Sequence, residues 1–208
     1  QDNIINFVGS LDESKGYTIL KYSGKNQLLS IEKDCTGLEI TKEFEVFDVA
    51  FLSGEYDSVF DKWFKMQEKY HNFKKTNAKP MCGYTSWYRH YEDISEEIIK
   101  NDLAGMLSLP QKIDIFQIDD GYETAVGDWL SIDEKKFPNG IKTVCDEIHN
   151  QNILAGLWLA PFVCETKSEI YKNHKDWLRK DENGNFVKCG SNWSGFYALD
   201  LYNSEVIA

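Results

Sequence analysis

The stretch "FQIDDGYE", residues 116–123, decides the fold class of this chain. It begins with an apolar run, which is typical of a strand buried on both faces in a parallel sheet. The run delivers two adjacent carboxylates, Asp119 and Asp120, and then Gly121, which allows a sharp turn. Two like charges held close together repel each other, and their desolvation adds to the cost. The pair therefore needs a partner or a ligand.

Strand and helix patterns alternate on both sides of this stretch, from residue 81 onward. Apolar runs indicate strands, and a period of three to four residues indicates helices. The alternation is typical of βαβ units, and so of a parallel sheet. A D-x-x-E pair, Asp93 and Glu96, predicts a capping box at the start of the first of these helices. The predicted strands are 81–87, 113–119, 153–161 and, as a short strand or connector, 196–201; the predicted helices are 93–107, 139–151, 168–180 and one that begins with Asn203 as its N-cap.

Both a (β/α)8 barrel and an open doubly wound sheet fit this α/β alternation. A G-x-G-x-x-G phosphate loop would favour the open sheet, and none follows a predicted strand. A complete barrel takes about 250 residues, and residues 81–208 supply about half of that length. The chain also starts without Met and stops as a helix begins. We therefore expect a piece of a longer enzyme that contains the first half of a (β/α)8 TIM barrel.

The N-terminal part of the chain has a different pattern. Short β-rich runs separated by turn residues indicate an antiparallel sheet, and we interpret residues 1–54 as the end of a β-sandwich domain. Helical periodicity with an aromatic stripe follows over residues 55–72, and we interpret this stripe as a packing face. Residues 55–80 are then a connecting helix and linker, and residues 81–208 are the half-barrel. The β-rich runs are 17–22, 27–33, 37–46 and 49–54.

Composition narrows the range of partners. The chain has 23 Lys and Arg against 34 Asp and Glu, a net charge of −11, which repels nucleic acid and anionic membrane surfaces. No apolar run approaches the roughly 18 residues of a membrane span, and nothing resembles a signal peptide, so we expect a cytoplasmic protein. The five cysteines include no C-x-x-C pair, which predicts reduced thiols rather than a disulfide framework or a zinc site.

Strand geometry suggests a role for the two aspartates. Successive side chains of a strand point to opposite faces, so Asp119 and Gln117 share one face while Phe116 and Ile118 pack against helices. Asp120 follows at the turn, and both carboxylates reach the C-terminal mouth, where barrel enzymes keep their sites. Neighbours on one backbone do not flank a glycosidic bond as the acid and nucleophile of a retaining glycosidase must. Holding two adjacent sugar hydroxyls fits them better, and capping the loop or the next helix is the structural alternative.

Aromatic residues accompany the aspartates at the same end of the predicted sheet. Trp87 and Tyr88 end the first predicted strand, and Trp158 lies near the end of the third. Flat rings at a barrel mouth are typical platforms for sugars, and core packing explains Trp158 equally well. A metal site would need a third ligand at another strand end, and no carboxylate follows the third strand until Glu165, so we expect no metal. Two further candidates, both in loops, are Trp129 and Trp193.

Seven segments of the chain, in this order and spacing, resemble α-galactosidases of glycoside hydrolase family 36. The resemblance implies a β-sandwich followed by a (β/α)8 barrel, and a homo-oligomeric retaining hydrolase. Its substrate would be an α-galactoside oligosaccharide such as raffinose, or melibiose, from which terminal α-linked galactose is released without a cofactor. The segments are "GYTSWYRHYEDISEE" (83–97), "FQIDDGYE" (116–123), "GDWL" (127–130), "KFPNGIK" (136–142), "AGLWLAPFV" (155–163), "HKDWL" (174–178) and "FYALDL" (196–201).

The same resemblance assigns expected roles to individual residues. Asp119 and Asp120 fall at the paired aspartates that hold galactose hydroxyls in the family. Trp87 and Tyr88 fall at its Trp-Tyr pair after the first barrel strand, and Trp158 falls at the tryptophan of its third strand.

The resemblance also places the catalytic carboxylates outside this chain. The family's nucleophile is an Asp in a Lys-x-Asp motif after the fourth strand, and the acid/base Asp lies further on, so both are expected beyond Ala208. Many members carry a substrate-binding Arg ahead of the fourth strand, where this chain has "CGSNWSG" (189–195), and Asn192 or Trp193 is the candidate substitute. We therefore expect galactose recognition without catalysis, or at most weak sugar binding, in this chain. Galactosyl transfer and action on N-acetylgalactosamine are open alternatives for the parent enzyme.

Overall fold

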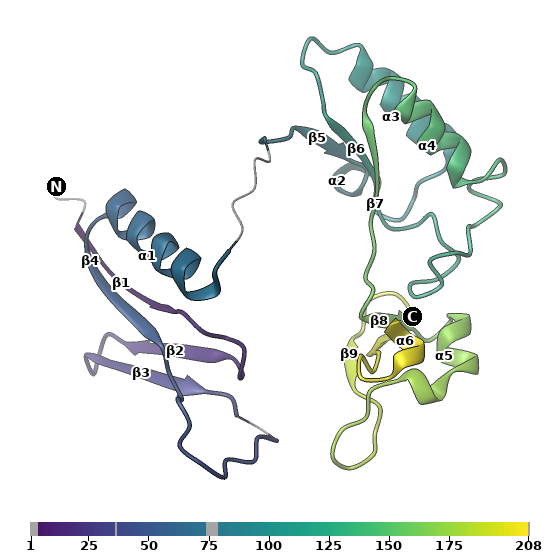
Figure 1. Cartoon of the computed structure of the whole chain (residues 1–208). Coiled ribbons are helices and arrows are strands. Elements are labelled where there is room, and N and C mark those ends of the chain that lie inside the picture. Colours follow the sequence, from purple (N-terminus) through teal and green to yellow (C-terminus); the bar gives the residue numbers. More distant parts are fainter. Residues whose placement is uncertain (1–3, 36, 74–78, 208) are drawn as a thin grey trace. The chain divides into compact units, whose positions relative to one another are not determined.

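The computed structural model of the chain describes residues 4–35, 37–73 and 79–207 (Figure 1). The chain divides into two compact units, residues 1–78 and 79–208. Most of the linker expected before residue 81 lies outside the described residues. Among the described helices, none is long and apolar enough to cross a membrane.

The described residues of the first unit form two antiparallel strand pairs and one helix (Figure 1). Strand β1 pairs with β4, and strand β2 pairs with β3. Three of the four predicted β-rich runs are therefore confirmed as strands, and so is the helix. The elements are β1 (Ile4–Ser10), β2 (Thr18–Ser23), β3 (Leu28–Lys33), β4 (Val49–Glu55) and α1 (Tyr56–His71).

Helix α1 packs its aromatic side against the β1–β4 pair. Val59 is fully buried, and the Phe7 ring of β1 lies 5.1 Å from the ring of Phe60 and 5.4 Å from that of Trp63. Buried aromatic side chains contribute large apolar areas, so this face holds the helix on the sheet. The interpretation of the stripe as a packing face is confirmed for Val59, Phe60 and Trp63, whereas Tyr56 and Phe64 are 56% and 59% exposed.

The predicted strand at residues 37–46 is wrong. The segment has no regular secondary structure, and Leu38 and Ile40 are 43% and 53% exposed. A β-rich run forms a strand only where a neighbour supplies hydrogen bonds and covers one face, and this run has no such neighbour among the described residues. Strand β4 pairs instead with β1, for which we made no sequence prediction.

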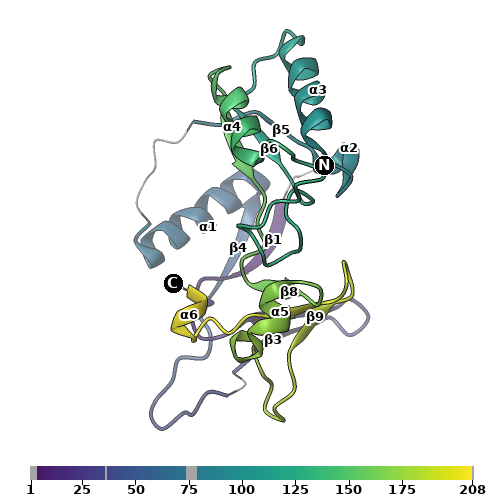
Figure 2. The ribbon, with the colours of Figure 1, turned by 90° about the vertical axis from the view of Figure 1, so that its right-hand side faces the viewer.

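The second unit contains the parallel sheet that the alternation predicts. Its strand order is β5-β6-β7, both pairs are parallel, and Gln117 of β6 lies opposite Thr85 on one side and Gly156 on the other. Helices α3 and α4 lie together along this sheet (Figures 1 and 2). The described residues form an open α/β arrangement and no closed barrel. The elements are β5 (Gly83–Thr85), α2 (Trp87–His90), α3 (Glu96–Leu107), β6 (Ile115–Ile118), α4 (Ile141–His149) and β7 (Leu154–Leu157).

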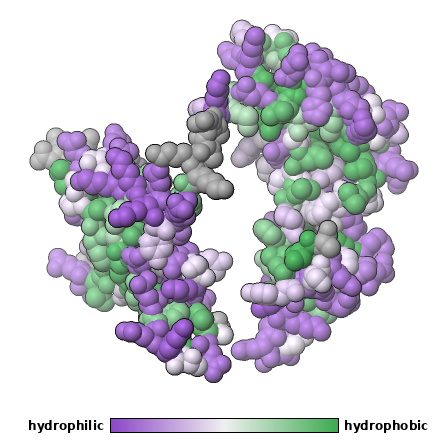
Figure 3. Space-filling view, viewed as in Figure 1, coloured by the Kyte–Doolittle hydropathy of each residue, from purple (hydrophilic) through white to green (hydrophobic). Residues whose placement is uncertain are grey.

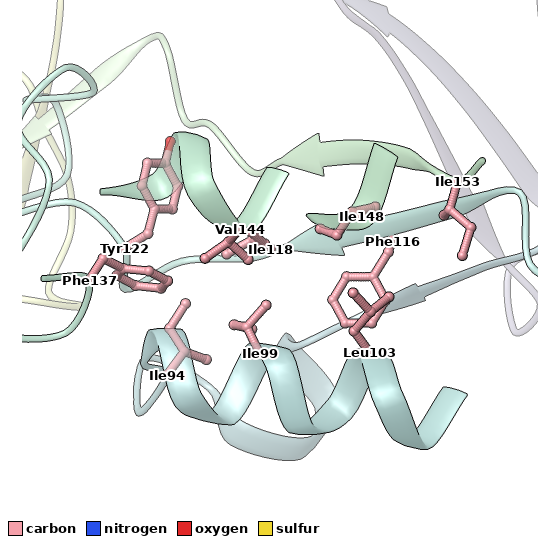
Figure 4. Packing of buried hydrophobic residues seen from close by; sticks show 10 residues of the cluster. All are labelled: Ile94, Ile99, Leu103, Phe116, Ile118, Tyr122, Phe137, Val144, Ile148 and Ile153. Carbon is pink, nitrogen blue, oxygen red and sulfur yellow. The ribbon is translucent and has the colours of Figure 1, made fainter. Parts of the chain in front are cut away.

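The main core lies between β6 and the two helices. Phe116 and Ile118 are fully buried and belong to one cluster with Ile99 and Leu103 of α3 (Figure 4). Burial of such a side chain stabilises the fold by about 1.5–3 kcal/mol. The predicted alternation along β6 is confirmed, and Gln117 points to the opposite face.

The predicted capping box of the first barrel helix is wrong. Helix α3 begins at Glu96 because the side chain of Ser95 accepts the backbone N–H of Ile98 at 3.3 Å, so Ser95 and not Asp93 is the N-cap. The carboxylate of Glu96 accepts two hydrogen bonds from the side chain of Asn139, at 3.0 and 3.2 Å. Glu96 therefore joins α3 to the segment before α4 instead of closing a box.

The helix predicted at 168–180 is also wrong in its length. It ends at Asn173 because His174 leaves the helical region, with φ −126° and ψ 60°.

Strands that precede and follow this helix form an antiparallel sheet of order β8-β10-β9. The N-cap at Asn203 is confirmed, since its side chain accepts the N–H of Glu205 at 2.9 Å. The elements are β8 (Val163–Glu165), α5 (Glu169–Asn173), the 3-10 turn Lys175–Trp177, β9 (Lys188–Gly190), β10 (Phe196–Ala198) and α6 (Ser204–Ile207).

Strand β7 is an edge of the parallel sheet among the described residues. Leu154, Leu157 and Leu159 on and after this strand are 55%, 40% and 50% exposed, and Phe162 is 62% exposed. On the face drawn in Figure 3, hydrophobic residues (green) reach the surface of both units. Large apolar residues in a row along an unpaired edge mark a surface that another segment or chain can cover.

Candidate functional site

A pocket of about 610 Å³ opens at the C-terminal end of the parallel sheet. This is the end at which α/β proteins bind their ligands, and the volume suits a small molecule. The pocket brings together six of the seven predicted site residues. Its lining is Thr85, Trp87, Tyr88, Glu92, Gln117, Asp119, Asp120, Trp158, Asn192 and Trp193.

Asp119 is built into the floor of the pocket. One oxygen, Oδ2, accepts from the Thr85 hydroxyl and from the Gln117 amide, both at 2.8 Å. The other, Oδ1, accepts the backbone N–H of Asp120 at 3.0 Å, and the N–H of Asp119 donates to Ser86 Oγ at 2.9 Å. Much of the hydrogen-bonding capacity of Asp119 is thus used within the protein. The structural alternative to ligand binding, in which the carboxylate accepts hydrogen bonds from the protein itself, therefore applies to part of the Asp119 side chain.

Asp120 is held by a residue distant in sequence, Trp193. Asp120 is 3% exposed, and its Oδ2 accepts a hydrogen bond from the indole Nε1 of Trp193 at 2.7 Å. A hydrogen bond to an ionised carboxylate is shorter and about twice as strong as a neutral one. A carboxylate offers about four acceptor positions, so one indole donor leaves room for sugar hydroxyls. Of the pair, Asp120 has the geometry of a ligand-holding residue.

Three tryptophans form a row beside the aspartates. Trp158 lies between the other two, with ring centroids 6.1 Å from Trp193 and 5.9 Å from Trp129. Trp158 and Trp193 line the pocket, whereas Trp129 packs against the main core. Trp129 therefore supports Trp158 from behind, and the structure does not bring it into the pocket with the other candidates.

Trp87 and Tyr88 lie on the short helix α2, which corrects the prediction that they end a strand. Strand β5 stops at Thr85, and the N–H of His90 donates to the Ser86 carbonyl at 3.0 Å, which closes a helical turn. Both side chains still line the pocket, and Tyr88 is 86% exposed. They form its rim rather than its floor.

A buried carboxylate on α3 anchors this rim helix. Asp102 is 7% exposed and accepts from His90 Nε2 at 2.6 Å and from the Tyr84 hydroxyl, and Arg89 NH1 lies 3.1 Å from it. A buried charge needs such partners to offset its desolvation. The result is a fixed α2, and therefore a fixed rim at Trp87.

A second, smaller cavity of about 100 Å³ lies behind Asp120, and Glu92, Glu123 and Glu165 line it with Asp120. Glu123 is 6% exposed, and its Oε2 is without a hydrogen-bond partner among the described residues. Burial, and then the neighbouring Asp120 carboxylate, raise the pKa of Glu123 to about 8. Partial burial and the same carboxylate also raise the pKa of Glu92. Two carboxyl groups around Asp120, Glu92 and Glu123, therefore have raised pKa values.

The carboxylates do not form a metal centre. Within the described ranges, no group of three or more His, Cys, Asp or Glu side chains is placed to hold a metal ion. The lysines Lys136 and Lys167 also line the smaller cavity, and their charges disfavour a cation there.

Sequence reasoning missed several residues of this region. Gln117 had a usable signal, because strand alternation puts it on the face of Asp119. Glu92 and Glu123 sit in loops without a motif, and Glu165 was considered only as a distant metal ligand. Their proximity to Asp120 depends on the path of loops that local sequence patterns do not specify.

Comparison with known proteins gives the family. The family model described as melibiase matches residues 49–208. The chain belongs to the melibiase family. The resemblance drawn from the seven segments is thereby confirmed.

Three similar proteins are identical to this chain at about a quarter to a third of the positions in the aligned segments. α-Galactosidase Mel36A of Lactobacillus acidophilus is 34% identical over 113 residues, which are 50% of this chain and 15% of that protein. α-Galactosidase AgaA of Geobacillus stearothermophilus is 27% identical over 128 residues, covering 54% and 17% of the two chains. The solved structure of TtGalA, an α-galactosidase from Thermus thermophilus in complex with stachyose, is 26% identical. It superimposes with a TM-score of 0.73 over 99% of this chain and 40% of that one.

The chain spans about one sixth of the length of these curated relatives and two fifths of the Thermus structure. Within this length, the mixed α/β fold of the melibiase family is present.

Proposed function

We propose that this chain carries the galactose-recognition part of a retaining α-galactosidase that acts on raffinose- or melibiose-type sugars. The single observation that supports this proposal most is the position of Asp120. Its carboxylate lines the large pocket, is fixed by Trp193, and shares that pocket with Trp158, whose ring contacts the Trp193 ring.

The proposed binding mode follows from the chemistry of a hexose. Sugar hydroxyls donate hydrogen bonds, which an ionised carboxylate accepts, and the apolar C–H face of the ring stacks on an aromatic side chain. In this proposal, Asp120 accepts from galactose hydroxyls, Trp158 and Trp193 cover one side of the sugar, and the Trp87 and Tyr88 rim meets the next residue of the oligosaccharide. Asp119 positions Asp120 and contributes its remaining acceptor capacity.

The proposal extends to the architecture of the whole enzyme. The parallel β5-β6-β7 sheet is taken as the first part of a (β/α)8 barrel, and the exposed edge of β7 as the place where a following strand pairs. The first unit is taken as the end of a β-sandwich domain. The catalytic aspartates of the family would be supplied by sequence beyond residue 208, so this chain alone binds galactose weakly and does not hydrolyse its glycosides.

One relative supports a second candidate within the same enzyme class. It is named "A type blood alpha-D-galactosamine galactosaminidase", from Flavonifractor plautii, and is 33% identical over 107 residues. A 2-amino or 2-acetamido sugar is therefore the competing substrate class.

A paired assay tests the proposal. The full-length protein, meaning this chain together with the sequence that adjoins it, is assayed on aryl α-galactoside, aryl α-galactosaminide and aryl α-N-acetylgalactosaminide. We expect the highest kcat/KM on the galactoside, and a loss of at least 100-fold in the Asp120→Asn variant, since a charged hydrogen bond to substrate contributes about 1.5–3 kcal/mol and two such bonds are expected here. Asp176→Asn, on an exposed residue, is the matched control. Unchanged kcat/KM in Asp120→Asn would reject the holding role, and preference for either amino sugar would select the second candidate.

A further inference from the structure

We propose that Glu165 is a positioning residue for galactose binding, acting through Ser194 and Trp193 on Asp120. The inference rests on the proposed function, because it assigns a role in the recognition of the same sugar. Glu165 ends strand β8 and is 1% exposed, which makes it one of the most deeply buried charged residues of the described chain.

The carboxylate of Glu165 joins two loops that come from different parts of the sequence. Its Oε1 accepts the backbone N–H of Val126 at 3.0 Å and lies 3.2 Å from Lys167 Nζ. Its Oε2 accepts from the Ser194 hydroxyl at 2.8 Å and from the Ser194 N–H at 3.2 Å. Four donors therefore offset the cost of burying this carboxylate.

These two loops carry the two ends of the hydrogen bond that fixes Asp120. Val126 lies six residues after Asp120, in the loop that follows β6, and Ser194 is the residue next to Trp193. The buried Glu165 side chain thus connects the loop that carries the acceptor, Asp120, to the loop that carries the donor, Trp193. The smaller cavity, which Glu165 lines together with Asp120 and Trp193, lies among the same residues.

The backbone of Trp193 gives a reason for such an anchor. Its φ is 54°, in the left-handed region that a bulky residue seldom adopts, and this conformation costs free energy unless its surroundings enforce it. The adjacent contacts do enforce it. Besides Glu165, Thr166 Oγ1 lies within hydrogen-bonding distance of the Ser194 carbonyl at 2.8 Å and of Ser194 Oγ at 2.9 Å, and the Thr166 N–H donates to the Gly195 carbonyl at 3.0 Å. Without Glu165, the loop loses the anchor that aims the indole N–H at Asp120.

A double-mutant cycle in the full-length protein tests the inference. Glu165→Gln keeps the shape of the side chain but removes its charge and presents an amide N–H₂ to a backbone donor. We expect it to raise KM for aryl α-galactoside about tenfold with kcat within twofold, because binding is weakened while the reacting groups are untouched. Trp193→Phe should have a similar effect. If Glu165 acts through Trp193, the double variant should have a KM less than twofold above that of Trp193→Phe alone. A double variant whose KM rises by the product of the two single effects would overturn the inference.

Three controls separate the outcomes. Glu169→Gln makes the same chemical change on the surface of α5, and its KM should equal that of the wild type. Each variant is melted by circular dichroism; if Glu165→Gln has no cooperative transition, Ser194→Ala, expected to raise KM about threefold, replaces it in the same cycle. If the wild type is active and the Glu165→Gln and Ser194→Ala variants have the same KM as the wild type, the inference is overturned and the proposed function stands. A wild type without saturable turnover of the galactoside overturns both.

Discussion

The indole of Trp193 and the carboxylate of Asp120 meet although 73 residues separate them in sequence, with Nε1 2.7 Å from Oδ2. The two residues come from loops on different sheets: Asp120 follows the parallel strand β6, and Trp193 precedes the antiparallel strand β10. The Asp120 side of the pocket therefore depends on a contact between two separately built parts of the second unit.

The Trp193 hydrogen bond gives the first expected outcome. Trp193→Phe removes the N–H donor and keeps an aromatic ring, so the Asp120 carboxylate loses its fixed orientation and galactose binding should weaken about tenfold. Equilibrium titration of the 208-residue chain with galactose, followed by tryptophan fluorescence, measures the dissociation constant. Trp177→Phe is the matched control, since its indole donates to Glu205 away from the pocket. Equal affinity in both variants would contradict the assignment.

The second prediction concerns Gly121, where the backbone conformation and a close neighbouring carbonyl leave no room for a side chain. Its φ is +108°, and a Cβ at this position would lie 2.4 Å from the carbonyl oxygen of Glu92. Gly121→Ala should therefore destabilise the fold by more than about 2 kcal/mol and displace Asp120, the preceding residue. Urea denaturation measures the change in the free energy of unfolding.

Gly105 in α3 is the control for this substitution. A Cβ there meets no atom within 4 Å, so Gly105→Ala should stabilise the chain by about 0.5–1 kcal/mol, as in an open helix position. Destabilisation by both alanines to the same degree would argue against a specific conflict at Gly121.

Glu123 makes stability depend on pH in a defined direction. Its pKa is raised to about 8 in the folded chain from an ordinary value of 4.5, so the folded state binds more protons than the unfolded state between these values. The free energy of unfolding should then fall as pH rises from 4.5 to 8. Glu123→Gln, which stays neutral, should remove this part of the slope and stabilise the chain at pH 8 by about 1–2 kcal/mol, since solvent in the adjoining cavity screens part of the effect.

Thermal or urea unfolding at pH 5 and pH 8 measures this difference. The exposed Glu97→Gln on α3 is the control, and its stability should follow the wild type at both values. A Glu123→Gln variant that gains no stability at pH 8 relative to pH 5 would show that the carboxyl is ionised in the folded chain.

The uncovered edge of β7 predisposes the 208-residue chain to self-association. Leu154 and Leu157 are 55% and 40% exposed on a strand that has one partner, β6, among the described residues. Such edges template pairing with another chain, and lysine on an edge opposes it. We expect the chain to elute as dimers or larger species in size-exclusion chromatography with light scattering, and Leu154→Lys to shift it toward monomer. A monodisperse, cooperatively melting monomer of the unchanged chain would contradict this expectation.

The sequence predicted the scaffold well and the loops poorly, for a physical reason. Phe116 and Ile118 follow a period of two that burial imposes, so the face of β6 and the position of Asp119 could be read locally. The N-cap at Asn203 is similarly local. In contrast, the segment 37–46 has β-rich composition but no neighbour to pair with among the described residues, and the helix after Ser168 ends at Asn173 without a sequence breaker. These outcomes depend on tertiary partners.

The candidate site divides in the same way. Asp119, Asp120 and Trp158 stand on or directly after strands, and their convergence follows from the parallel arrangement of strand ends. Trp193 was an open candidate because its loop carries no periodic signal, yet it provides the donor to Asp120. Glu165 was missed as an anchor because nothing local indicates that the carboxylate at the end of β8 meets Val126 and Ser194.

The long sequence separation between Trp193 and Asp120 also bears on the order in which the molecule assembles. Contacts between distant segments form late, since the entropy of closing a long loop must be overcome before they contribute. The core of α3, β6 and α4 uses nearer neighbours and can form first. We therefore expect two stages in refolding: helix formation seen by far-ultraviolet circular dichroism, and a slower change in Trp193 fluorescence as the sugar-binding end closes. This chain would thus acquire its shape before its capacity to recognise a ligand.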